Sequence, residues 1–142
     1  MMFRRPTIFA VVISCILLLP GWDCAPLQTA VIVEPGVSFA LAPGQTAEVK
    51  RADTRVTFRQ VRQDSRCPVD VTCVWEGNAE VEVIISRTGA ANETRILSLK
   101  APNNEVQVGT LRIKFVGLTP VPRQADGNTP KNYLAEFVAE PV

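Results

Sequence analysis

The residues best suited to chemistry are Cys67 and Cys73, which enclose residues 68–72 near the middle of the chain. Zinc sites use cysteine pairs two to four residues apart and complete the set with a second pair or with histidines. The sequence has no histidine, and its other two cysteines, Cys15 and Cys24, lie near the N-terminus. Thioredoxin-type redox chemistry uses a closer Cys-x-x-Cys spacing. The pattern therefore predicts no metal site, but a structural disulfide that forms in an oxidising compartment.

Carboxylates are the other candidates for chemistry. Asp64, Asp70, Glu76 and Asp126 lie in or near expected loops, where a pair of them could serve a small hydrolase. Loop carboxylates are more often turn formers and solvated charges. Without histidine there is no Ser-His-Asp or Cys-His arrangement, and no phosphate-binding glycine loop is present. We therefore expect no catalytic residues, no cofactor and no enzyme, with a carboxylate-dependent hydrolase as an alternative.

The loop around the two cysteines carries the residues that we expect to bind a partner: Arg66, Asp70, Trp75 and Glu76. Trp75 follows the second cysteine by two positions, so both side chains share a face if this stretch is extended. Trp75 then either packs over the disulfide as a small local core or stacks on a ligand. A braced loop of this kind suits a binding module, and residues 69–71 could alternatively be presented to a protease as an inhibitor would present them.

Residues 64–79 read D-S-R-C-P, four further residues, and then C-V-W-E-G-N-A. This stretch resembles the signature of a family of small bacterial secreted proteins and lipoproteins of uncharacterised function, D-S-R-C-P-x4-C-x-W-x-G-x-A followed by an alternating strand. The flanking residues 54–85 match in pattern only. The resemblance implies an exported domain and brings no activity, cofactor or catalytic residue with it.

Residues 1–24 are predicted to be a signal peptide or lipoprotein leader. Arg4 and Arg5 form the positive region, and residues 7–19 form an apolar run that is shorter than the roughly 20 residues of a membrane-spanning helix. We therefore expect the protein in the periplasm or at the cell surface.

Cys24 lies where a bacterial lipoprotein carries its lipidated cysteine. Gly21 and Asp23 depart from the usual residues before such a cysteine. Lipidation at Cys24, which would anchor the protein to a membrane, and ordinary cleavage of the leader therefore both remain open.

Residues 25–142 are predicted to form one all-β domain. Apolar and polar residues alternate over residues 54–59, 79–86 and 111–115, and turns rich in proline and glycine separate the alternating stretches. We expect a single antiparallel β-sandwich, or a small barrel, of about eight short strands. The alternation changes phase after Phe58, which predicts a β-bulge near Gln60.

The pattern of residues 54–61 recurs over residues 111–118, and each copy is followed by a loop and an alternating strand. The recurrence is either a degenerate repeat or a chance likeness of two bulged strands. The second loop, residues 119–131, is long and polar, which is typical of a mobile or binding loop. Glu80 and Glu82 are expected to face arginines across the first strand pair, and these arginines form either a solvated rim or an anion-binding patch.

The net charge of +1 gives no indication of nucleic-acid binding. Taken together, the sequence favours a monomeric, exported module of the cell envelope that has a binding or structural role. The expected partner is an envelope protein or a glycan.

Overall fold

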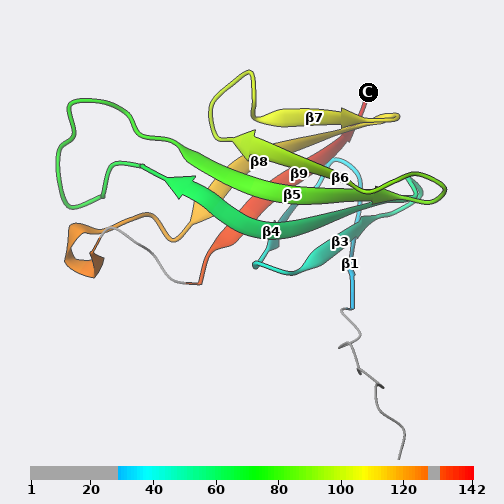
Figure 1. Cartoon of the computed structure of the whole chain (residues 1–142), viewed down its shortest axis with the longest axis horizontal. Coiled ribbons are helices and arrows are strands. Elements are labelled where there is room, and N and C mark those ends of the chain that lie inside the picture. Colours follow the sequence, from blue (N-terminus) through cyan, green and yellow to red (C-terminus); the bar gives the residue numbers. More distant parts are fainter. Residues whose placement is uncertain (1–28, 128–131) are drawn as a thin grey trace, which may run out of the picture.

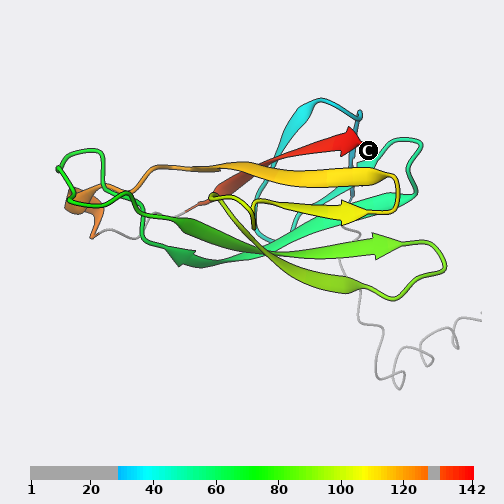
Figure 2. The same cartoon turned by 90° about the horizontal axis from the view of Figure 1, so that it is seen from above.

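The computed structural model describes residues 29–127 and 132–142, in which nine strands form two sheets packed face to face (Figure 1). The five-stranded sheet has the order β1 (Val31–Val33), β3 (Thr46–Val49), β4 (Thr54–Asp64), β5 (Ala79–Arg87) and β6 (Glu93–Ser98). The four-stranded sheet has the order β2 (Ser38–Leu41), β9 (Leu134–Pro141), β8 (Leu111–Thr119) and β7 (Glu105–Val108). The predicted all-β sandwich is confirmed, and the sheets do not close into a barrel (Figure 2).

One strand pair departs from the antiparallel arrangement that the sequence predicts. β1 pairs with β3 in parallel, with Val31 opposite Ala47, whereas the other described pairs are antiparallel. The parallel pair arises because the chain crosses to β2 in the other sheet before it returns as β3. Alternation within a strand does not report on this crossing, so the sequence could not predict it.

The core lies between the sheets and is built from the apolar positions of the alternating strands. Phe137 of β9 lies at its centre and contacts phenylalanines of both sheets. Its ring centroid is 6.3 Å from that of Phe58, 5.6 Å from Phe115 and 6.0 Å from Phe39. All four rings are buried, and each of the three pairs contributes about 1 kcal/mol in addition to the buried area.

The predicted bulge near Gln60 is confirmed. The register of β4 against β5 shifts between Phe58 and Gln60, and the shift restores Val61 to a half-buried position against the core. β8 has a corresponding shift against β9 between Phe115 and Gly117. Both bulges follow a buried phenylalanine at the same place in the recurring pattern, so the two units share the position of this bulge as well as their sequence pattern.

Glu82 of β5 lies on the outer face of its sheet, yet its side chain is only 8% exposed because it is covered from β4. Arg59 pairs with its carboxylate at 2.7 Å and Arg62 at 3.4 Å, and the Gln60 amide donates a hydrogen bond at 3.2 Å. The expected pairing of Glu82 with arginines across the strands is confirmed.

The predicted leader, residues 1–24, and Cys24 lie outside the described residues, as does the expected domain boundary at residue 25. In the part of the chain that is described, no helix has the length and apolar character needed to cross a membrane.

Candidate functional site

Two long loops project together from one end of the sandwich (Figures 1 and 2). The first, residues 65–78, joins β4 to β5, and the second, residues 120–133, joins β8 to β9 and contains the short 3-10 helix η1 (Gln124–Asp126). We call residues 65–78 and 120–127 the tip. The tip lies far from the start of β1, which is the first strand after the predicted leader (Figure 1).

The first loop leaves the sheet through a narrow neck. The Ser65 amide donates to the Asn78 carbonyl at 2.8 Å, and the Asn78 amide donates to the Ser65 hydroxyl at 3.2 Å. A Cβ atom on Gly77 would lie 1.7 Å from the Ser65 carbonyl oxygen, so only glycine fits where the two segments of the neck pass each other. Asn78 also exchanges hydrogen bonds with Ser98 of β6, which fastens the neck to the sheet.

The predicted disulfide is confirmed and closes the small loop beyond the neck. Cys67 and Cys73 are bonded, with their Cα atoms 5.9 Å apart. Inside this ring the Val71 amide donates to the Pro68 carbonyl at 3.3 Å, so residues 68–71 form a turn. A disulfide is compatible with an exported protein, because the cytosol keeps most thiols reduced.

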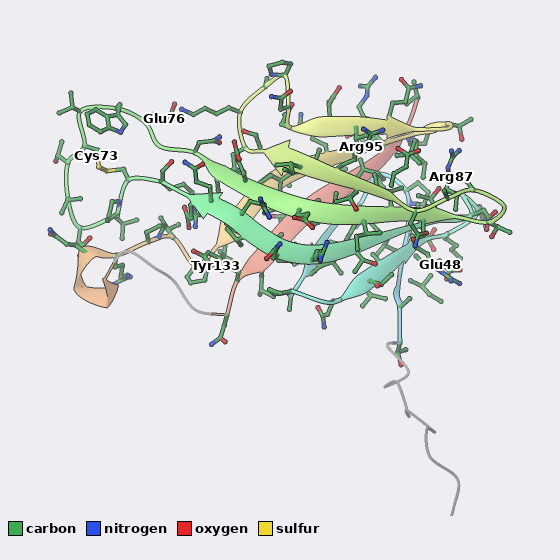
Figure 3. All side chains as sticks on the ribbon, viewed as in Figure 1. Glu48, Cys73, Glu76, Arg87, Arg95 and Tyr133 are labelled. Atoms are coloured by element: carbon green, nitrogen blue, oxygen red, sulfur yellow. A yellow bond between two sulfur atoms is a disulfide. The ribbon has the colours of Figure 1, made fainter. Side chains whose placement is uncertain are left out.

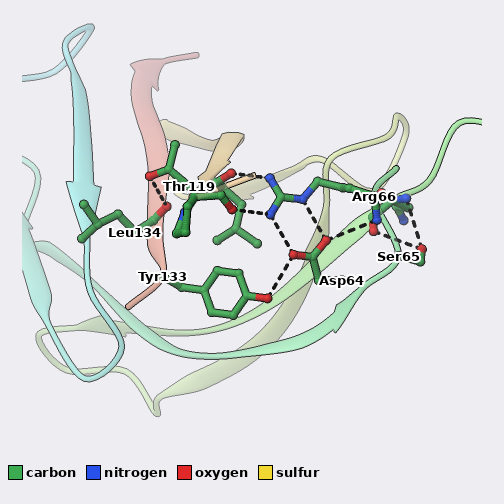
Figure 4. A network of polar contacts seen from close by, with 9 residues as sticks. Asp64, Ser65, Arg66, Thr119, Tyr133 and Leu134 are labelled. Atoms are coloured by element: carbon green, nitrogen blue, oxygen red, sulfur yellow. Dashed lines mark hydrogen bonds and ion pairs between the residues drawn. The ribbon is translucent and has the colours of Figure 1, made fainter. Parts of the chain in front are cut away.

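An ion pair at the base of the tip joins the two loops (Figure 4). The Arg66 guanidinium donates two hydrogen bonds to Asp64, at 2.8 and 2.7 Å, and Tyr133 donates a third at 3.0 Å. The same guanidinium donates to the carbonyls of Leu118 and Pro120, the latter at 2.9 Å. Arg66 and Asp64 are 13% and 6% exposed, so this pair holds the start of the second loop from inside the protein.

The ionisation of these groups follows from their contacts. Burial alone would raise the pKa of the Asp64 carboxyl, but the hydrogen bonds and charge of Arg66, with the Tyr133 hydroxyl, hold that pKa below its usual range. Burial and the hydrogen bond to Asp64 raise the pKa of Tyr133 to about 12. At neutral pH the base of the tip therefore contains a carboxylate, a guanidinium and a protonated phenol.

Asp70 makes a second connection between the loops. Its carboxylate accepts hydrogen bonds from the backbone amides of Gln124 at 2.9 Å and Ala125 at 3.5 Å, so it caps η1 from the other loop. These bonds, the one from Gln124 above all, lower the pKa of Asp70. The Val69 amide also donates to the Pro122 carbonyl at 3.1 Å. Each loop is thereby held by the other.

The four expected binding residues separate into two groups. Arg66, which is largely buried, and Asp70, which is exposed, fasten the second loop, whereas Trp75 and Glu76 extend into solvent. Trp75 is 76% exposed, so the expected small core of Trp75 over the disulfide is wrong. The reason is that residues 73–75 do not lie in a strand, and the alternation of side chains does not apply to them.

Trp75 belongs to a group of apolar side chains exposed on the tip, together with Val69, Val71, Val74 and Val121. Val74 is 95% exposed, Val69 60% and Val121 43%. The sequence pattern indicates no role for Val74 or Val121, because a lone valine in a loop carries no distinguishing pattern. Contiguous apolar surface often marks an interaction site, and the two most exposed of these side chains, Val74 and Trp75, are neighbours in the chain.

Glu76 follows Trp75 directly in the chain and lies on the same loop as Cys73 (Figure 3). Its side chain is 91% exposed, and its carboxylate is 3.7 Å from the Lys100 ammonium. Lys100 also donates to the Glu76 carbonyl at 2.9 Å, so the same ammonium contacts both the backbone and, less closely, the carboxylate.

The carboxylates considered for hydrolysis have different surroundings. Asp64 is paired with Arg66, Asp70 caps η1, and Glu76 is solvated. Asp126 lies in η1, and its side chain is outside the described part.

Comparison with known proteins gave no further assignment: no family model matched the chain, and no curated protein or solved structure was found to be similar. The resemblance carried by residues 64–79 therefore stays an expectation.

Proposed function

We propose that this protein is an exported, non-enzymatic module of the cell envelope that binds a partner through its tip. The observation that carries the proposal is the exposure of Val74 and Trp75, at 95% and 76%, on a loop that is braced on all sides. The disulfide, the Arg66–Asp64 pair and the Asp70 cap restrict its conformations before any partner arrives. Such preorganisation lowers the entropy cost of binding.

Export is supported by the character of residues 1–24 and by the disulfide. The resemblance of residues 64–79 to exported proteins points the same way. Lipidation at Cys24 would tether the chain on the side of β1, and the tip, being far from β1, would then be free to meet an envelope protein or glycan (Figure 1).

The alternatives have less support. A protease inhibitor presents an extended segment to the cleft, whereas residues 68–71 form a turn and Asp70 is engaged with η1. A hydrolase needs a carboxylate pair across a substrate, and Asp64 is instead covered by Arg66 and Tyr133. A purely structural protein would have no use for an exposed tryptophan on a braced loop.

The test is binding of the processed protein to the envelope fraction of its own cells. We expect Trp75→Ala and Val74→Ser to reduce the bound amount at least about tenfold, as loss of a central anchor does. The matched control is Ile96→Ser, because Ile96 of β6 is 52% exposed but lies outside the tip. If both tip variants bind as the wild type does, while their urea unfolding is unchanged, the proposal is wrong.

A further inference from the structure

The tip has a definite chemical character that narrows the class of its partner. Its apolar side chains are exposed on a projecting loop, and beside them stands the Glu76 carboxylate, which is 91% exposed and has the Lys100 ammonium at 3.7 Å. The other described acids of the tip region are engaged, Asp64 with Arg66 and Asp70 with η1. We infer that the tip enters an apolar pocket on a folded protein, and that a lysine or arginine at the rim of that pocket meets Glu76. This inference rests on the proposed function.

The size of the apolar group favours a pocket over a second copy of the chain. The apolar group has five exposed side chains, and the largest apolar patch on a typical monomer covers about 300–600 Å². Each partner of a stable interface of standard size buries about 800 Å². Two convex tips placed against each other would bury less than this, whereas a concave pocket would also cover the sides of Val74 and Trp75 and the flanking backbone.

The bracing of the tip favours a protein over a lipid bilayer. A fluid bilayer adapts to whatever shape enters it, so a fixed loop geometry gives little advantage there. A pocket of fixed shape binds more tightly a loop that already has its bound conformation, because less entropy is lost on binding. The first loop is held by the disulfide and by the neck, and the second by Arg66 and Asp70.

The charge of the tip points in the same direction. Residues 65–78 and 120–127 contain two arginines and three carboxylates, so their net charge does not attract anionic headgroups, and the Glu76 carboxylate beside the tryptophan is 91% exposed although Lys100 lies 3.7 Å from it. A cation at the rim of a protein pocket would complement it, and rim charges of this kind steer association and select the partner. Trp75 would then be the anchor and Glu76 the contact that sets specificity.

The first experiment places a photoreactive benzoylphenylalanine at position 74 in cells that make the protein, with position 96 as the matched control. We expect position 74 to cross-link to one protein, at a pocket of apolar residues that has a lysine or arginine at its rim, and position 96 to give no such product. Cross-links to lipid or glycan at position 74 overturn this inference and leave the proposed function standing. Equal labelling at both positions, or none at position 74, overturns both.

The second experiment measures binding of the processed protein to the cross-linked protein after purification. Trp75→Ala should weaken binding about 100-fold, as a hot-spot anchor does, and Glu76→Gln about 3-fold, with loss of the salt dependence. Equal affinity of Glu76→Gln and wild type at low salt would overturn the cationic rim.

A vesicle arm tests the bilayer directly. Trp22 lies in the predicted leader, so with Trp22→Phe the emission reports on Trp75 alone. A blue shift on adding vesicles of phosphatidylcholine, with or without phosphatidylglycerol, would overturn the protein pocket, and an unchanged spectrum supports it.

Discussion

The two strand–loop–strand units of the sandwich have a bulge at the same position of their first strand, but different contacts hold their loops. β4 and β5 form the first unit and β8 and β9 the second, and each has a bulge after a buried phenylalanine. The first loop closes on itself through Cys67 and Cys73. The described part of the second loop has no disulfide and is held by side chains of the first.

The contacts between the loops show this dependence in detail. The first unit supplies the side chains, Arg66 and Asp70, and the second supplies mainly backbone, the carbonyl of Pro120 and the amide of Gln124. Backbone groups are present whatever the sequence is, so the second loop can differ in its side chains and still be held. The conformation of the second loop therefore depends on contacts with the first loop, which is itself braced by the disulfide.

The largest loss of stability is expected for Arg66→Ala. It leaves Asp64 buried without its partner and frees the start of the second loop, which should lower the free energy of unfolding by about 3 kcal/mol. Urea unfolding measures this loss. The matched control is Arg123→Ala, since Arg123 is the exposed arginine at the corresponding position of the second unit and should change stability by less than about 0.5 kcal/mol. Equal losses would contradict the asymmetry between the units.

The next effect concerns the disulfide. Replacing Cys67 and Cys73 together by serine should lower the free energy of unfolding by about 2 kcal/mol, because the closed loop is short. The connections through Arg66 and Asp70 remain, so the second loop should keep its structure. Urea unfolding gives the first quantity, and hydrogen exchange at Gln124 and Ala125 gives the second. Fast exchange at both amides in the double variant would show that the second loop depends on the disulfide as well as on Arg66 and Asp70.

A smaller and pH-dependent effect is expected for Tyr133→Phe. At pH 7 the variant loses a hydrogen bond to the Asp64 carboxylate, which should cost about 1 kcal/mol. The pKa of Asp64 is lowered in the folded protein, so the stabilisation by its charged form is present above the unfolded value of about 4 and is lost as the pH falls through the folded value. The difference between variant and wild type should therefore shrink below about pH 4. A difference that stays constant from pH 7 to pH 2 would contradict this role of Asp64.

The smallest effect is local. Asp70→Ala removes the cap of η1 and should speed hydrogen exchange at the amides of Gln124 and Ala125, with less effect on urea unfolding than loss of the disulfide. Asp70→Asn is the control, since an asparagine oxygen also caps helices. Faster exchange in the asparagine variant, equal to that of alanine, would mean that charge rather than geometry holds η1.

Much of the fold could be predicted from local patterns. Alternation identified β4, β5 and β8, and the phase change after Phe58 identified the bulge at Gln60. The parallel placement of β1 beside β3 could not be predicted, because it depends on a crossing between sheets. Local patterns describe neighbours along the chain and contain no information about which strand pairs with which in a sheet.

The candidate site was predicted less completely, for the same reason. The loop and its disulfide follow from the spacing of Cys67 and Cys73, but the contacts of Arg66 and Asp70 with the second loop depend on partners more than fifty residues away. The outward position of Trp75 depends on the absence of strand geometry at that residue.

The neck at Ser65 and Asn78 has a consequence for engineering. The two segments of the neck are joined by the hydrogen bonds between Ser65 and Asn78 and meet closely at Gly77. The segment beyond the neck therefore forms a replaceable cassette. The entropy cost of a longer insert grows only slowly with its length, and the register of β4 and β5 is fixed below the neck. Foreign peptides grafted in place of residues 68–72 should thus be displayed in a constrained form above the neck, while the second loop loses the contacts that Val69 and Asp70 make with it.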